Sequence, residues 1–187
     1  MALLESILIP LGTKMPAFEL KDPYGKVYKS DDLYDTGKGR GLIVAFTCNH
    51  CPYAGAVWPR VVKIAKYARG MRINTVAINP NINPDYPEDS PENMKTLIKE
   101  LGIDFPYLVD ETQKTADAFK AQCTPDIYLF DNNQKLVYHG RVDDNWQDET
   151  KVTKEELKEA LNNYASGKGV SADQKPSMGC SIKWRQS

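Results

Sequence analysis

The sequence lacks the features of several large classes of protein. It has four cysteines in 187 residues and a formal net charge of −1. Four cysteines are too few for a secreted disulfide scaffold, and a balanced charge disfavours nucleic acid as the main partner. The longest interior apolar run, residues 42–46, is far shorter than the roughly 20 residues that a membrane-spanning helix needs. The cysteines are therefore expected to be reactive thiols or metal ligands.

The first twelve residues are apolar but do not resemble a secretory signal. They contain Glu5, lack a basic start and reach Pro10 early, whereas a signal peptide needs a positive start and a longer apolar core. We therefore expect a soluble, cytoplasmic protein, with neither a membrane nor a nucleic acid among its partners. The chain length predicts one domain over residues 1–169, followed by a polar tail, 170–187, that packs back on it.

Strand and helix patterns alternate along the chain. Short β-branched runs are followed by segments with helical spacing of apolar residues, and the side chains of Asp110 and Thr153 each suggest a capping box. Strands are predicted at 41–48, 72–79, 105–109, 127–130 and 136–139, and helices at 52–69, 91–101, 110–121 and from 153 to before Gly167. Such alternation predicts an α/β fold, with a central mixed sheet and helices on both of its faces.

The strongest chemical motif is Cys48-Asn49-His50-Cys51-Pro52, at the junction of a predicted strand and a helix. A helix N-terminus favours an anion, so we expect it to lower the pKa of the Cys48 thiol, and Cys51 can then close a disulfide with it. The His50 imidazole can stabilise the same thiolate by a hydrogen bond or a positive charge. We expect His50→Ala to raise the Cys48 pKa and to make the reduction potential more negative.

A second motif, Cys123-Thr124-Pro125, comes directly before a predicted strand, where a cis X-Pro bond can turn the chain. Together with the CxxC motif, it resembles the thioredoxin superfamily and, within it, the redoxin branch of AhpC/TSA-like and peroxiredoxin-like proteins. The segments that carry this resemblance are FTCNHCPYA, INPNINPDYPEDSPENM, FPYLVDETQ, CTPDIYLFD, VYHGRVDDN and PSMGCSIKW. They are similar to an uncharacterised peroxiredoxin-like group.

The resemblance implies a thioredoxin-like fold and a redox site. In it Cys48 is the attacking cysteine and Cys51 the resolving one. Pro125 is the cis-proline beside them, and Thr124 offers its backbone to an extended substrate. No cofactor is implied. The partners are protein or small-molecule thiols and disulfides, with a thioredoxin-type reductant.

The chain departs from the family pattern at three positions. Thr47 replaces the tryptophan that thioredoxins carry before the first cysteine, and Leu42 replaces their buried acid. Asp126 is the remaining candidate for a proton acceptor, although its position is also that of a solvated acid at a loop edge. Ala45 stands where peroxiredoxins need a threonine before the peroxidatic cysteine, so the resemblance does not by itself imply peroxidase activity.

The other two cysteines leave alternatives open. If Pro125 lies against the CxxC motif, Cys123 lies near the same surface. Ile182 and Trp184 could anchor the tail, bringing Cys180 to Cys123 or to the CxxC motif as an auxiliary redox couple. The alternative interpretation is that Cys123 is a small buried residue and Cys180 an incidental thiol.

Three functions follow from these residues. The first is a thiol–disulfide oxidoreductase that cycles a Cys48–Cys51 disulfide through a mixed disulfide. The second is a thiol peroxidase, an antioxidant activity in which one cysteine becomes a sulfenic acid. The third is a metal-binding module in which Cys48, Cys51, Cys123 and Cys180 converge on a tetrahedral site.

Overall fold

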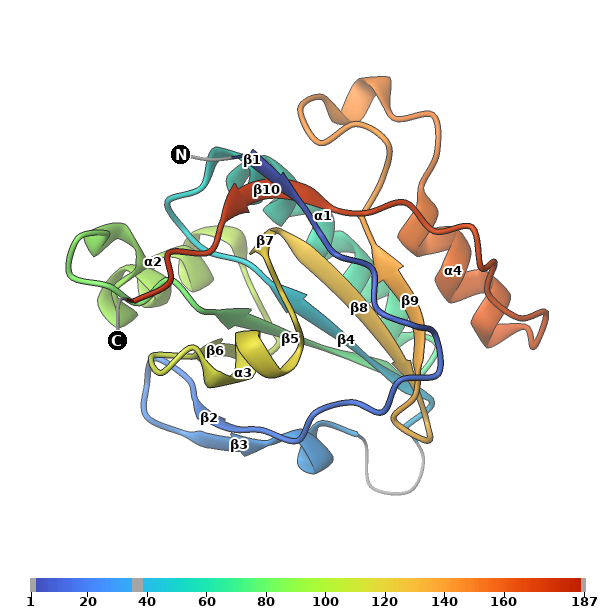
Figure 1. Cartoon of the computed structure of the whole chain (residues 1–187), viewed down its shortest axis with the longest axis horizontal. Helices are drawn as coiled ribbons and strands as arrows, with labels where there is room; N and C mark the ends of the chain where they lie inside the picture. The colour runs from blue at the N-terminus through green and yellow to red at the C-terminus, as the bar shows by residue number, and fades with distance from the viewer. Residues whose placement is uncertain (1–2, 35–38, 186–187) are drawn as a thin grey trace.

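The computed structural model describes residues 3–34 and 39–185, and within them the main sheet has seven strands (Figure 1). Strands β4, β5 and β6 run parallel, and β8 and β9 form an antiparallel hairpin. The order across the sheet is β3-β2-β6-β5-β4-β8-β9. This confirms the α/β class with a mixed sheet. The strands are β2 (Glu19–Lys21), β3 (Val27–Lys29), β4 (Gly41–Phe46), β5 (Ile73–Asn79), β6 (Tyr107–Val109), β8 (Asp126–Asp131) and β9 (Leu136–Gly140).

Helices cover both faces of this sheet. Helices α1 (Pro52–Arg69), α2 (Pro91–Leu101) and α4 (Glu156–Ala165) pack on one face, and the short α3 (Lys114–Ala118) packs on the other. Successive side chains of a strand point to opposite faces, so a strand covered on both sides must be apolar throughout. The central strand β4 meets this requirement, since each of its residues is buried. It brings the CxxC motif to one edge of the core.

A second, three-stranded sheet lies beside the first and joins the two ends of the chain. In it β10 (Met178–Ser181) runs between β1 (Leu3–Glu5) and β7 (Cys123–Thr124), antiparallel to both. Figure 1 shows β1 and β10 crossing the molecule side by side above β7. The tail is anchored by Ile182, which is buried in the core, whereas Trp184 is 42% exposed and is not the anchor expected from the sequence.

The predicted helices at 52–69 and 91–101 are confirmed, but both predicted capping boxes are wrong. Helix α4 begins after Glu155, and the Thr153 hydroxyl donates to Asp144 instead. At α3 the capping group is the Asp110 carboxylate, which accepts from the Ala116 N–H at 2.8 Å. The fourth residue of that predicted box, Gln113, has another role. Its amide donates to the Lys183 carbonyl at 2.8 Å and so ties the tail to the domain.

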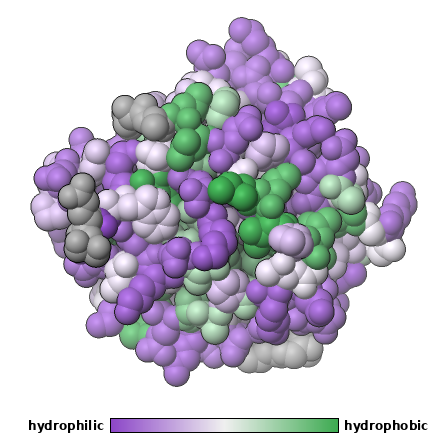
Figure 2. Space-filling view, viewed as in Figure 1, coloured by the Kyte–Doolittle hydropathy of each residue, from purple (hydrophilic) through white to green (hydrophobic). Residues whose placement is uncertain are grey.

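Among the described residues, no helix is both long enough and apolar enough to span a membrane. The exposed apolar side chains gather near the N-terminus, where Ile7 is 61% exposed. Figure 2 shows apolar patches on the face along which this N-terminal segment runs. The remainder of that face is mostly polar.

A substitution at Phe119, at the end of α3, tests how α3 packs on the second face of the sheet. Its ring is fully buried and packs edge-on against Phe46, Tyr128 and Phe130, with the Phe46 ring centroid at 5.2 Å. We expect Phe119→Ala to lower the free energy of unfolding by about 3–5 kcal/mol, because the change removes a large buried ring and leaves a cavity. Chemical denaturation measures this loss, and Tyr24→Ala, at an exposed ring, is the control. A loss below about 1 kcal/mol would show that α3 does not depend on this packing.

Candidate active site

The CxxC motif lies where β4 leaves the sheet and α1 begins. Cys51 is the N-cap of α1 and Pro52 is its first residue, a position that suits proline because the first turn lacks hydrogen-bond partners for its N–H groups. The Trp58 indole, in the second turn of α1, donates to the Cys48 carbonyl at 3.2 Å. This bond joins the loop to the helix and fixes both cysteines relative to α1. All four cysteines are free thiols and buried.

Thr124 contacts both cysteines of the motif. Its hydroxyl lies 3.1 Å from Cys48 Sγ, and either group can donate. The Cys51 thiol donates to the Thr124 carbonyl at 3.3 Å. The Thr124–Pro125 peptide bond is cis, as the sequence predicts. The two motifs, far apart in the chain, therefore meet in one site.

The two thiols ionise in the opposite order to the one expected from the sequence. Burial raises the pKa of the Cys48 thiol well above its usual range, and its bond to Cys51 and the nearby Asp89 charge add to the rise. The Cys51 pKa is lowered to about 5, because the Cys48 thiol, the thiol and N–H of Cys180 and the Ala54 N–H stabilise its thiolate. Burial opposes this shift, but the donors outweigh it. The helix N-terminus thus acts on Cys51, its N-cap residue, through the Ala54 N–H.

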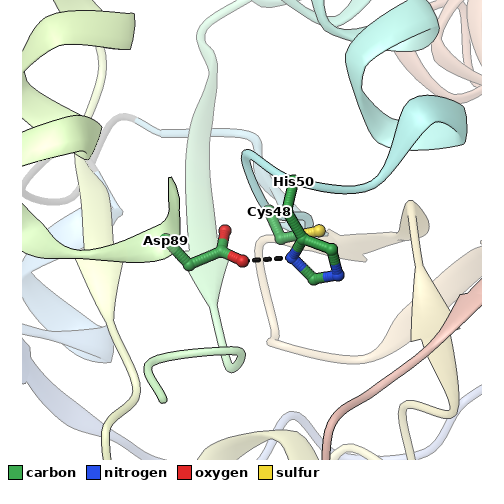
Figure 3. A group of neighbouring side chains, drawn as sticks. All are labelled: Cys48, His50 and Asp89. Carbon is green, nitrogen blue, oxygen red and sulfur yellow. Dashed lines mark hydrogen bonds and ion pairs between the residues drawn. The ribbon is translucent and has the colours of Figure 1, made fainter. Parts of the chain in front are cut away.

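His50 is held by Asp89, a residue that the sequence analysis missed. The imidazole Nδ1 is hydrogen-bonded to an Asp89 carboxylate oxygen (Figure 3). Asp89 ends the short 3-10 helix η2 (Pro87–Asp89), is fully buried, and accepts from the Asn49 N–H at 2.6 Å and the Asn79 amide at 3.0 Å. A carboxylate that accepts from several donors leaves the proton on Nδ1. The other ring nitrogen, Nε2, is buried without a partner.

The sequence did contain an indication of Asp89. It lies in the run Pro87-Glu88-Asp89-Ser90-Pro91, where two prolines stiffen a turn just before a helix. Nothing in that spacing shows which carboxylate turns inward. The structure shows that Glu88 is exposed and that Asp89 is buried beside the motif.

Cys180 joins the site, whereas Cys123 does not. Cys48, Cys51 and Cys180 share one buried cluster. Cys123 precedes Thr124 in a strand and so faces the other way; its thiol lies 3.7 Å from the Pro125 carbonyl, and burial raises its pKa far above the usual range. Asp126 is not a solvated loop acid, because it is fully buried and bonded to His139 at 3.0 Å.

The backbone of Thr124 is not free for an incoming substrate in this structure. Cys180 of β10 lies directly opposite Thr124 in the antiparallel ladder, and Ser181 lies opposite Cys123. The expected substrate-binding edge is thus occupied by the chain's own tail. Substrate that pairs with Thr124 would have to displace β10.

The residues that could hold a metal are not those expected from the sequence. The four cysteines do not form one group of ligands. The side chains that converge are Cys48, His50 and Asp89, whose potential ligand atoms lie within 4.8 Å of one another. Asp89 already accepts a hydrogen bond from His50. The three residues are therefore arranged to orient the imidazole beside the Cys48 thiol.

The fold and the paired thiols define a thioredoxin-like protein. The structure resembles the thioredoxin domain of a thiol–disulfide oxidoreductase from Bacteroides vulgatus, with a TM-score of 0.58 and 17% identity over 71% of this chain and 89% of that one. The chain belongs to the AhpC/TSA family, which it matches over residues 11–139. The matched residues include Cys48, Cys51 and Pro125 and end before β10.

Two other proteins are similar to this chain. It is 25% identical to the thiol-disulfide oxidoreductase ResA of Bacillus subtilis over 126 residues, which cover 67% of this chain and 64% of ResA. The chain thus spans less than two thirds of that relative. An uncharacterised conserved protein from Geobacillus kaustophilus is 43% identical, with a TM-score of 0.93 over 100% of this chain and 98% of that one.

The ionisation of Cys51 is directly measurable. We expect the thiolate absorbance of the reduced protein to rise with a midpoint near pH 5, which is the pKa of Cys51. Because this pKa is lower than that of the unfolded chain, the thiolate stabilises the reduced protein at higher pH, and the contribution is lost as the pH falls through about 5.

Three variants assign that midpoint. Cys51→Ser should remove it, Cys180→Ala should raise it because one donor is lost, and Cys123→Ser should leave it unchanged. A midpoint near pH 5 that disappears in Cys48→Ser but survives in Cys51→Ser would instead place the thiolate on Cys48.

Proposed function

We propose that this protein is a thiol–disulfide oxidoreductase that cycles a disulfide between Cys48 and Cys51. The observation that carries the proposal is that the free thiols of Cys48 and Cys51 pack in one buried cluster at the start of α1, with Cys51 favoured as a thiolate. Two such thiols can be oxidised together to a disulfide and returned to thiols, a two-electron exchange that needs no bound cofactor.

The chemistry divides between the two cysteines. Cys48 loses its proton to the neighbouring imidazole and attacks a substrate disulfide; one substrate sulfur leaves as a thiolate and a mixed disulfide forms. Cys51, already a thiolate, then attacks Cys48 Sγ, closes the Cys48–Cys51 disulfide and releases the second substrate sulfur. The substrate gains two electrons and the pair loses two. A protein or small-molecule thiol, such as a thioredoxin-type reductant, restores the pair.

The substrate side of the site is a cavity beside Pro125. It has a volume of about 120 Å³ and is lined by apolar residues that include Val57, Trp146 and Met178, and by the charged residues Glu5, Arg141, Asp143 and Asp144. The apolar part of this lining suits an apolar side chain next to a disulfide-bonded cysteine. Pro125 thus contributes to substrate binding through this cavity, whereas Thr124 positions the two thiols.

The first test separates disulfide exchange from peroxide reduction. We expect the protein to catalyse insulin reduction by dithiothreitol and to consume hydrogen peroxide no faster than free thiols do, since Ala45 stands where a peroxidase needs a threonine. Cys48→Ser should abolish the insulin reaction, and Cys51→Ser should trap a mixed disulfide at Cys48, which mass spectrometry detects. Cys123→Ser is the matched control and should retain activity. Peroxide turnover that depends on Cys48, without insulin reduction, would favour the peroxidase alternative.

The second test addresses His50 and Asp89. We expect His50→Ala and Asp89→Asn to slow mixed-disulfide formation by about 10²-fold, the size of effect that a lost proton acceptor has. Asp89→Asn presents an amide to Nδ1 and so reverses the proton position on the ring. Glu88→Gln is the control, because it removes an adjacent exposed charge without touching the imidazole.

A potential measurement separates catalysis from simple packing. We expect His50→Ala also to raise the Cys48 pKa further and to make the reduction potential more negative in a titration against glutathione. If the rate falls while the potential and the pH profile stay those of the unchanged protein, His50 is only a packing residue.

A further inference from the structure

Cys180 is placed to react with the Cys48–Cys51 pair. Its thiol lies in the buried cluster that contains both cysteines, and Cys180 is one of the groups that lower the pKa of Cys51. Cys180 is 3% exposed, so solvent and other thiols do not compete for it in this arrangement. Contact between a thiol and a sulfur of a disulfide is the approach that thiol–disulfide exchange needs.

The backbone of β10 holds Cys180 in this place. Cys180 lies opposite Thr124, whose carbonyl also accepts from the Cys51 thiol at 3.3 Å. Further along the same pair of segments, the Ile182 N–H donates to the Gln122 carbonyl at 3.0 Å. Hydrogen-bonded pairs alternate along an antiparallel ladder, so Cys180 and Thr124 also fall on a hydrogen-bonded pair. Cys180 and Cys51 are therefore positioned by the same residue.

The strand can approach this closely because residue 179 is glycine. A Cβ atom at Gly179 would lie 2.0 Å from the Thr124 carbonyl oxygen and 3.0 Å from Pro125 Cδ. Any side chain there would push β10 away from the Thr124–Pro125 loop and take the Cys180 thiol with it. The close approach is thus a requirement for the contact between Cys180 and Cys51.

We propose that Cys180 is a third redox-active cysteine, which exchanges with the Cys48–Cys51 disulfide to give a Cys51–Cys180 disulfide. The Cys180 thiolate attacks Cys51 Sγ, the Cys51–Cys180 bond forms, and the Cys48–Cys51 bond breaks. Cys48 leaves as a thiolate and takes up the proton that Cys180 lost. One disulfide replaces another, so the step needs no external oxidant or reductant.

The proposal rests on the proposed function, because it starts from the Cys48–Cys51 disulfide. It gives the protein two oxidised forms. In the first, a disulfide joins Cys48 and Cys51. In the second, the disulfide joins Cys51 at the start of α1 to Cys180 in the tail, and Cys48 is a free thiol beside His50.

Disulfide mapping tests the proposal. The unmodified protein is equilibrated in glutathione redox buffers, quenched with acid, alkylated and digested, and the linked peptides are identified by mass spectrometry. We expect both Cys48–Cys51 and Cys51–Cys180 peptides. In Cys48→Ser we expect Cys51–Cys180 to be the main bridge, and in Cys123→Ser both bridges should remain.

Two variants of β10 test the role of its position without removing a thiol. Gly179→Ala should lower the yield of the Cys51–Cys180 bridge several-fold, whereas Ser181→Ala, one residue past Cys180 on the same strand, should leave it unchanged. Circular dichroism checks that each variant is folded. Equal yields in the two variants would contradict the positioning argument.

The result that would overturn the proposal differs from the failure of the proposed function. If the unmodified protein forms Cys48–Cys51 while Cys180 is recovered fully alkylated in every buffer, the proposal is wrong and the oxidoreductase function stands. If no Cys48–Cys51 peptide forms at all, the proposed function fails. Should Cys48→Ser not fold, the map of the unmodified protein decides alone.

Discussion

The arrangement of the site depends on the contacts of one residue, Thr124. Its hydroxyl meets Cys48 and its carbonyl meets Cys51, so a single backbone unit sets the position of both thiols. The same residue pairs with Cys180 of β10. Three segments that are distant in the chain thereby become one redox centre, and a shift of the Thr124–Pro125 loop would move every sulfur contact in it at once.

A second constraint is the burial of charge beside these thiols. A fully buried carboxylate such as Asp89 costs several kcal/mol unless hydrogen bonds compensate it, and here Asn49, Asn79 and His50 supply them. The charge has two effects on the site. It orients the imidazole through Nδ1, and it disfavours a thiolate on Cys48. Burial disfavours that thiolate more strongly still, so ionisation falls on Cys51, whose thiolate Cys48, Cys180 and Ala54 stabilise.

The tail changes how the site must be understood. A redox-active pair of cysteines at the start of a helix is usually open to solvent and substrate. Here both cysteines are buried, and β10 lies along the Thr124–Pro125 loop that they contact. The close approach at Gly179 shows that this packing is tight. Access to Cys48 and the position of Cys180 are thus coupled, because both depend on the same strand.

Much of the fold could be predicted from residue patterns, since those patterns report local requirements. The apolar run of β4, the helix that follows it and the β8–β9 hairpin each depend on residues close in the chain. The three-residue strands β1, β2 and β3 could not, because they are too short for any periodicity to show. Their partners, and not their own sequence, make them strands.

The same division holds for the site. Residue patterns alone predict the CxxC motif, its place before a helix and the proline turn that meets it, because spacing and helix-start residues encode them locally. The folded structure is needed to show that Asp89 holds His50, that Cys51 and not Cys48 carries the lowered pKa, and that Cys180 joins the pair while Cys123 faces away. Burial, charge and sulfur contacts arise between segments far apart in the chain, and no local pattern specifies them.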